Sequence, residues 1–338
     1  MAANRWREWI RTEGKVNSPA RLFLLNSCLD ELFFEARVDD RYDPACAGIG
    51  ILMYFFLFFV VGMLAVQVIC SLIYLFRGHI TFTEEDTQAA VMIMVPCYNE
   101  GENELKKTFD SVINTIYPEE NKVMVVVADG VITGSGEAYS TPEICARLLD
   151  FEIDFEDDEC YHYKSRGKKR DNYASIYTGT FECEVNEVEK SLKYIVIVKR
   201  GAPEDRAGDR AGNRGKRDSQ LVITGMLNRI HHNREPEELD MALVKALFSV
   251  GLPAKDIEYL MCIDADTRVH EHSINHMIYA MERDKNCLAC CGETQVDNKA
   301  QSWVTMIQVF EYYSSHHLKK AFESVFGCVT CLPGCFTM

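Results

Sequence analysis

One long apolar run dominates the hydrophobic pattern near the start of the chain. No charged side chain lies between Ile49 and Phe76, and the most polar residue in the run is Gln67. At about 1.5 Å per residue, a helix of this length exceeds the roughly 30 Å hydrocarbon core of a bilayer. The pattern therefore predicts one transmembrane helix over residues 49–76, and a buried core helix is the alternative.

Residues 1–45, before this run, have a different pattern. Tryptophan, phenylalanine and leucine alternate there with many charged residues. Such mixing is typical of amphipathic helices at a membrane surface. The sequence therefore predicts a juxtamembrane region of amphipathic character over residues 1–45, with no readable function.

From Ala90 onwards, short apolar runs alternate with helix-like periodicity. Val91–Val95 and Val123–Ala128 are both rich in β-branched residues and are typical of buried strands. Between them, Asn99 with Glu102 resembles a capping box, followed by Leu105, Phe109, Val112 and Ile116 on one helical face. This β-α-β order predicts an open α/β sheet that binds ligands at the carboxyl ends of its strands.

The rest of the chain extends the same pattern. Further strands are predicted at Tyr194–Val198, Tyr259–Ile263 and Leu288–Cys291. A helix is predicted from Gln220, and a long one over Trp303–Phe326. Residues 90–338 are therefore expected to form one α/β domain.

Charge and cysteine content narrow the classes of function. The chain has 36 basic and 51 acidic residues, a net charge of -15, which is the wrong sign for a general nucleic-acid binder. Its 14 cysteines are scattered through a chain too long to be a disulfide-stapled miniprotein, so reduced thiols are expected.

Acidic residues follow two of the predicted strands. Asp264 and Asp266 come directly after one strand, so both carboxylates can reach the crevice at its end. Asp129 follows another. Carboxylate oxygens suit a hard divalent cation that also binds diphosphate oxygens. The acids therefore predict a metal and nucleotide-diphosphate site, although an isolated D-x-D pattern also occurs in ordinary turns.

A basic pair is the second candidate component of this site. Lys216 and Arg217 follow a glycine- and arginine-rich loop and could neutralise phosphate charge, or could be ordinary surface cations. Tyr98, at the end of the first strand, could stack on a base or simply pack. The spacing alone does not decide between these alternatives.

The cysteines near the end of the chain allow a different hypothesis. Cys287 and Cys290 form one C-x-x-C pair, Cys328 and Cys331 form another, and Cys291 and Cys335 lie near them. This spacing permits a four-thiolate zinc site. Because the first pair lies in a predicted strand, whose alternating sides would separate the thiols, a structural zinc is the weaker alternative.

Five motifs follow one another along the chain: Pro96–Glu100, Ala128–Gly130, Gly215–Gln220, Asp264–Thr267 and Cys331–Phe336. Taken together and in this order, they resemble the motifs of chitin synthases, which are processive membrane-bound glycosyltransferases of family 2. A sixth segment, Glu311–Ser324, is also similar to the family pattern. The resemblance covers roughly Ala90 to Met338, and its strength comes from the order and spacing of the motifs.

The resemblance implies a GT-A-like, Rossmann-related α/β domain with a central mixed sheet. It implies transfer of N-acetylglucosamine from UDP-N-acetylglucosamine to the non-reducing end of a β-1,4 chain, with inversion and with Mg²⁺ or Mn²⁺ as cofactor. The resemblance implies that Tyr98, Glu100 and Asp129 bind the uridine and that Asp264 and Asp266 bind the metal. It implies that Lys216 binds the diphosphate, with Arg217, Ser219 and Gln220 in the same loop. The implied entrance for acceptor and product is lined by Cys331, Leu332, Pro333, Gly334, Cys335 and Phe336.

The resemblance also implies where the protein acts and with what. It implies a multi-pass protein of the plasma membrane with its catalytic domain in the cytosol, and the lipid bilayer, the nucleotide sugar and the nascent chitin chain as partners. Nucleic acid is not expected, and a homodimer stays open. The helix before Cys331 is expected at the membrane interface.

The family pattern continues beyond Met338 with an acidic motif that supplies the general base and with a Gln-x-x-Arg-Trp motif. We therefore expect this chain to be a fragment that binds donor and metal but makes no polymer. The alternatives are a cellulose or hyaluronan synthase, and a membrane-anchored scaffold without activity.

Overall fold

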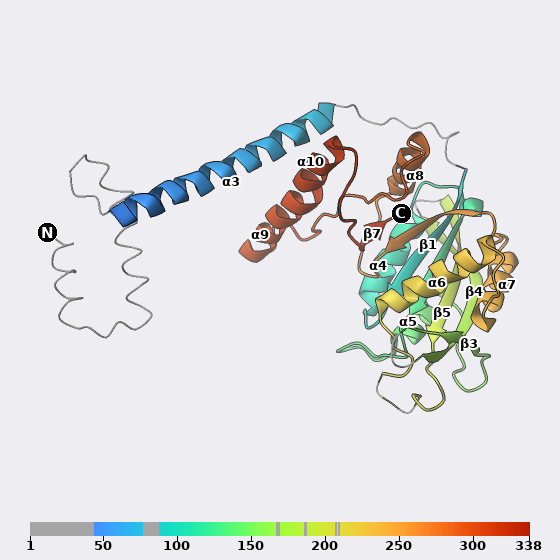
Figure 1. Ribbon diagram of the computed structural model, residues 1–338. Helices are drawn as coiled ribbons and strands as arrows, with labels where there is room; N and C mark the ends of the chain where they lie inside the picture. Colours follow the sequence, from blue (N-terminus) through green and yellow to red (C-terminus); the bar gives the residue numbers. More distant parts are fainter. Residues whose placement is uncertain (1–43, 77–87, 167–169, 186–187, 207, 209) are drawn as a thin grey trace, which may run out of the picture. The chain divides into compact units, whose positions relative to one another are not determined.

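A computed structural model of the protein describes residues 44–76, 88–166, 170–185, 188–206, 208 and 210–338 (Figure 1). The predicted amphipathic region over residues 1–45 lies almost entirely outside these residues. The chain divides into two compact units, one made of residues 1–77 and 318–327 and the other of residues 78–317 and 328–338.

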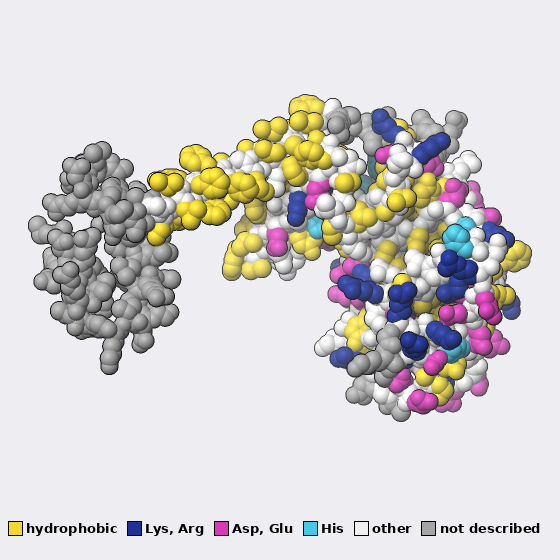
Figure 2. Space-filling view, in the orientation of Figure 1, with side chains coloured by type: hydrophobic (Ala, Val, Ile, Leu, Met, Phe, Trp, Pro, Cys, Tyr) yellow, Lys and Arg dark blue, Asp and Glu magenta, His cyan; other side chains and the backbone are white. Residues whose placement is uncertain are grey.

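The first unit contains one long apolar helix, α3 (Pro44–Phe76). Among the described residues it is the one helix long and apolar enough to cross a membrane, over Gly48–Tyr74 with a mean hydropathy of 2.6. Its side chains are apolar along its length (Figure 2), and most are exposed. In the same unit α10 (Lys319–Val325) packs against α3, where Cys70, Ser71 and Ala321 are buried.

The second unit is built on a mixed sheet of seven strands in the order β3-β4-β5-β2-β1-β6-β7 (Figure 1). The four central strands are parallel, and the remaining pairings, β3 with β4, β4 with β5 and β6 with β7, are antiparallel. The predicted α/β class with a central mixed sheet is confirmed. The strands are β1 (Ala90–Cys97), β2 (Lys122–Ala128), β3 (Tyr161–Lys164), β4 (Asp171–Val185), β5 (Val188–Lys199), β6 (Ile257–Ile263) and β7 (Phe336–Thr337).

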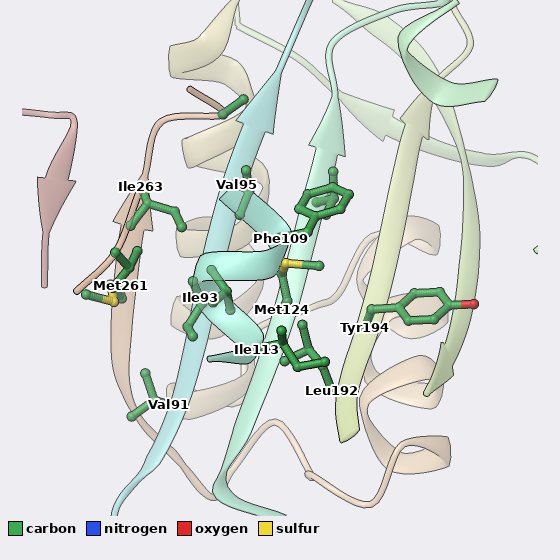
Figure 3. Close-up of a cluster of buried hydrophobic side chains, with 14 of the residues drawn as sticks. Val91, Ile93, Val95, Phe109, Ile113, Met124, Leu192, Tyr194, Met261 and Ile263 are labelled. Atoms are coloured by element: carbon green, nitrogen blue, oxygen red, sulfur yellow. The ribbon is translucent and has the colours of Figure 1, made fainter. Parts of the chain in front are cut away.

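Helices cover both faces of this sheet because the side chains of β1 alternate between two apolar clusters. Val91, Ile93 and Val95 pack on one face with α4 (Glu102–Ile113), whose Phe109 and Ile113 are labelled in Figure 3. The same apolar cluster includes buried residues of α5 (Thr141–Leu149) and α8 (Ser273–Arg283). Met92 and Met94 pack on the opposite face with α6 and α7. The helices are α4 (Glu102–Ile113), α5 (Thr141–Leu149), α6 (Lys216–His231), α7 (Glu238–Ser249), α8 (Ser273–Arg283) and α9 (Trp303–Tyr312).

Several sequence-based boundaries are wrong. The helix after β1 starts at Glu102 with Gly101 as its N-cap, whose amide donates to Glu104, so Asn99 does not cap it. Ile116 lies beyond the end of that helix. α6 starts at Lys216 rather than at Gln220, because a glycine with positive φ, Gly215, precedes it.

Two predicted elements near the C-terminus also differ from the structure. The expected strand Leu288–Cys291 is irregular, with one isolated bridge from Cys291 to Thr337, and Leu288 is exposed. The expected long helix at Trp303–Phe326 is helical over most of its length, but a π-helical segment, η3 (Tyr313–Leu318), separates α9 from α10.

A fully buried lysine makes the stability of this unit depend on pH. The Nζ of Lys122, at the start of β2, donates to the carbonyl oxygens of Ile113 and Thr115 and to the Thr115 hydroxyl, at 3.2 to 3.5 Å. Burial lowers the pKa of Lys122 from 10.5 to about 8. Between these two values the unfolded chain binds more protons than the folded one, so stability rises with pH.

We therefore expect wild type to gain about 3 kcal/mol of stability relative to Lys122→Met as the pH rises from 8 to 10.5. The measurement is the melting temperature of wild type and of Lys122→Met in nanodiscs across this pH range. The difference between the two proteins isolates Lys122, because all other titrating groups are common to both. A difference that stays constant with pH would contradict the lowered pKa of Lys122.

Candidate active site

The carboxyl ends of three neighbouring parallel strands bring the predicted site residues to one edge of the sheet. β1 lies between β2 and β6 and is parallel to both. Tyr98 and Glu100 follow β1, Asp129 follows β2, and Asp264 follows β6. Ligands of open α/β sheets bind outside this edge, so the turns that carry these residues border a common candidate site.

The turn after β1 is held by its own acidic residue. The Glu100 carboxylate accepts the backbone amides of Tyr98 at 2.6 Å and Asn99 at 3.1 Å. The Thr141 hydroxyl, in the first turn of α5, donates to the Tyr98 carbonyl oxygen at 3.1 Å. The backbone at Tyr98 is therefore held from two sides, while its side chain is only half-buried.

Asp129 is buried and most of its hydrogen-bonding capacity is used. Its Oδ1 accepts Lys199 Nζ at 2.8 Å and the Arg214 amide at 3.0 Å, and its Oδ2 accepts the Gly215 amide at 2.7 Å. Asp129 thus holds Arg214 and Gly215, the two residues before α6, against the end of β2. Sequence reasoning missed Lys199, because a lysine that ends a strand resembles a surface residue.

The motif predicted for the diphosphate forms the first turn of α6. Lys216 and Arg217 are exposed at the helix N-terminus, where unpaired amides favour anions. Ser219 is fully buried, and its hydroxyl has no hydrogen-bond partner among the described residues. Gln220 is half-buried and donates to the Cys262 sulfur of β6 at 3.4 Å. Of the four, only Lys216 and Arg217 are exposed.

The two aspartates after β6 lie in different surroundings. The Lys216 ammonium contacts Asp264 Oδ1, so α6 and the end of β6 meet here. Asp266 is exposed, and within the described part of the chain its side chain makes no hydrogen bond or ion pair. The intervening Ala265 is buried, and its carbonyl oxygen accepts the Thr108 hydroxyl of α4 at 2.6 Å. The turn Asp264–Asp266, called the aspartate turn below, is thus held against α4.

This donor set suits a hard cation that shares its ligands with a substrate. The contact with Lys216 shows that the Asp264 carboxylate already faces a positive charge. Two carboxylates with open coordination positions are typical of Mg²⁺ bound together with phosphate oxygens and water. Within the described residues, no group of three or more His, Cys, Asp or Glu side chains could hold a metal ion alone. Asp264 and Asp266 could therefore supply only part of the coordination shell of such a cation.

The Cys331–Phe336 segment lies directly beside the aspartates. β7 pairs with β6 through Ile263 and Phe336, and the Asp264 amide donates to the Cys335 carbonyl oxygen at 3.1 Å. Phe336 is buried, Cys331 and Gly334 are exposed, and the other members of the segment, Leu332, Pro333 and Cys335, are half-buried. A segment about 70 residues later in the chain thus borders the same edge, a contact that the sequence motif could not reveal.

The zinc hypothesis receives no support from the described residues. Cys335 pairs with the Thr294 hydroxyl at 3.2 Å, and Cys290 donates to the Met277 carbonyl oxygen at 3.8 Å. In the part of the chain that the structure describes, these cysteines form no group of three or more side chains that could hold a metal ion.

Comparison with known proteins identifies relatives of the chain. A sequence model described as chitin synthase matches residues 68–338. The chain is 41% identical over 315 residues to chitin synthase 6 of Mycosarcoma maydis, covering 92% of this chain and 26% of that protein. It is 44% identical over 259 residues to chitin synthase C of Emericella nidulans, covering 74% and 22%. It is also 41% identical over 253 residues to chitin synthase 3 of Candida albicans, covering 72% and 21%. The chain thus spans about a quarter of the length of these relatives.

Proposed function

The chain belongs to the chitin synthase family, and from this premise we propose that its α/β unit is the donor-binding part of a chitin-forming glycosyltransferase. The donor is UDP-N-acetylglucosamine. The transfer extends the non-reducing end of a β-1,4-linked chain with inversion, and the growing chain enters beside Cys331–Phe336. The adjacency of this segment to the aspartate turn supports the acceptor role, because donor and acceptor must meet near the metal.

The observation that carries this proposal is the meeting of Lys216 with Asp264, from α6 and the end of β6. An exposed lysine and an aspartate of the Asp264–Asp266 pair are in contact at one sheet edge, which supports binding of a diphosphate by the lysine and of its metal ion by the aspartates. Asp264 and Asp266 would hold Mg²⁺ or Mn²⁺, which when bound neutralises negative charge on the leaving diphosphate. Lys216 adds a second positive charge, and Arg217 a third at the helix N-terminus.

The nucleoside is assigned to the turns after β1 and β2. Tyr98 offers a ring face for the base, and Glu100 is half-buried beside it. Asp129 contributes mainly through the loop that it anchors, because both its oxygens already accept protein groups. These roles agree with the family resemblance of the motifs.

We further propose that α3 crosses a lipid bilayer and that the α/β unit lies in the cytosol, where nucleotide sugars are found. The full protein would be a multi-pass protein of the plasma membrane. Apolar exposed side chains on α9, including Trp303, Ile307 and Phe310, support contact of this helix with the membrane interface.

The test is to measure the binding of UDP-N-acetylglucosamine to the purified chain in nanodiscs by calorimetry, once with Mn²⁺ and once with EDTA. We expect Mn²⁺-dependent binding that Lys216→Met weakens roughly tenfold, because a charged hydrogen bond to the diphosphate is lost. Lys255→Met, which removes an exposed lysine just before the opposite end of β6, should leave the affinity unchanged. Equal affinity for a guanosine or adenosine diphosphate sugar would contradict the proposed donor.

A further inference from the structure

A buried ammonium group joins three elements at the candidate site. Lys199 ends β5 and is fully buried. Its Nζ lies 2.8 Å from Asp129 Oδ1 and 2.9 Å from Asp218 Oδ2. Asp129 follows β2, and Asp218 lies in the first turn of α6. The side chains of all three residues are at most 5% exposed, so none of them lies on the substrate-facing surface.

Each of the two carboxylates holds further backbone or side-chain groups around the start of α6. Asp129 accepts the amides of Arg214 and Gly215, the last two residues before the helix. Asp218 accepts the Ser165 hydroxyl at 2.7 Å and the Tyr163 hydroxyl at 3.1 Å. Burial, followed by the charge of Asp218, raises the pKa of Tyr163, so that tyrosine remains a hydroxyl donor.

The charges of this cluster depend on the lysine. Two buried carboxylates that share one cation repel each other and lose their hydration, and the cation between them offsets both effects more strongly than the neutral hydroxyl and amide donors do. Lys199 is the cation that contacts both. Without it, the repulsion is relieved either by protonation of one aspartate, which weakens the hydrogen bonds that it accepts, or by movement of the two aspartates apart. That movement would separate α6 from β2 and shift Lys216, which is two residues from Asp218.

We propose that Lys199 is a positioning residue for donor binding: it holds the N-terminus of α6, and therefore Lys216, at the sheet edge by bridging Asp129 and Asp218. The identity of the ligand rests on the proposed function. The positioning itself is a property of the unliganded protein and can be measured without any ligand.

Lys122 provides a matched control because it is the other fully buried lysine in the central strands. It lies at the opposite end of β2, and its Nζ bonds to two carbonyl oxygens and a hydroxyl rather than to carboxylates. Its loss removes a buried lysine from the same domain without changing the charge balance at the start of α6.

The first experiment measures UDP affinity with Mn²⁺ by calorimetry in nanodiscs. We expect Lys199→Met to weaken binding roughly tenfold, which corresponds to about 1.4 kcal/mol. Adding Asp218→Asn restores the original net charge of the cluster and should recover part of the affinity. Lys122→Met should bind UDP like wild type. Wild-type affinity in folded Lys199→Met, or further loss in the double variant, would overturn the proposal.

The second experiment is hydrogen exchange without ligand, on the peptides that contain the Arg214 and Gly215 amides. We expect faster exchange there in Lys199→Met and unchanged exchange across β1. If Lys199→Met does not fold, Lys199→Arg keeps the charge but changes its geometry, and should also speed this exchange. Wild-type exchange in the folded variant would overturn the positioning role. If wild type does not bind UDP but Lys199→Met shows the expected faster exchange, only the proposed donor would be refuted.

Discussion

Replacing Asp266 by asparagine is expected to weaken Mn²⁺-dependent binding of UDP-N-acetylglucosamine roughly 30-fold, or about 2 kcal/mol. Asp266 is exposed at the sheet edge, and its carboxylate is not engaged by any group of the described chain. It can therefore bind a metal ion without first breaking a protein contact. An amide keeps the shape but removes the charge that a hard cation requires.

The fold should be unaffected by this change, because an exposed side chain without partners contributes little to stability. Asp256→Asn is the matched control, since Asp256 is also exposed but lies before the opposite end of β6. Calorimetric titration of Mn²⁺ in the presence of UDP, together with melting temperatures, separates the two effects. Unchanged Mn²⁺ dependence in Asp266→Asn would remove this residue from the metal site.

The second large effect is expected for Gly212→Ala, which should destabilise the α/β unit by about 2 kcal/mol or more and weaken UDP binding. Gly212 has a φ of 78°, which disfavours any residue with a Cβ atom. A Cβ there would also collide with the Lys199 carbonyl oxygen and lie 2.9 Å from the Gly201 amide nitrogen. Because the segment leads to Arg214 and Gly215, its displacement would also disturb Asp129.

Gly208→Ala is the control in the same loop. Gly208 does not have positive φ, and an added Cβ would lie 3.3 Å from the Asp205 carbonyl oxygen. We expect its melting temperature and UDP affinity to stay close to those of wild type. Equal melting temperatures for Gly212→Ala and wild type would show that the backbone at Gly212 can relax without cost.

The apolar pattern predicted the central strands because their burial depends on local composition. β1, β2 and β6 consist largely of Val, Ile, Met and Leu, and each was expected within a few residues of its observed bounds. The β3–β4 hairpin was not predicted, because its strands mix polar and apolar residues and are only partly buried. Helix starts were also misplaced, since caps depend on backbone geometry at Gly101 and Gly215.

The order of the motifs alone indicated the family, and the comparisons confirmed it. The sequence by itself also determined the α/β class and the apolar helix, because both follow from local periodicity and composition. Tertiary structure decided that Lys199 joins Asp129 to Asp218, that Lys216 meets Asp264, and that the Cys335 backbone lies against the aspartate turn. These contacts join residues far apart in the chain, and only the packing of strands and helices brings their charges within hydrogen-bonding distance.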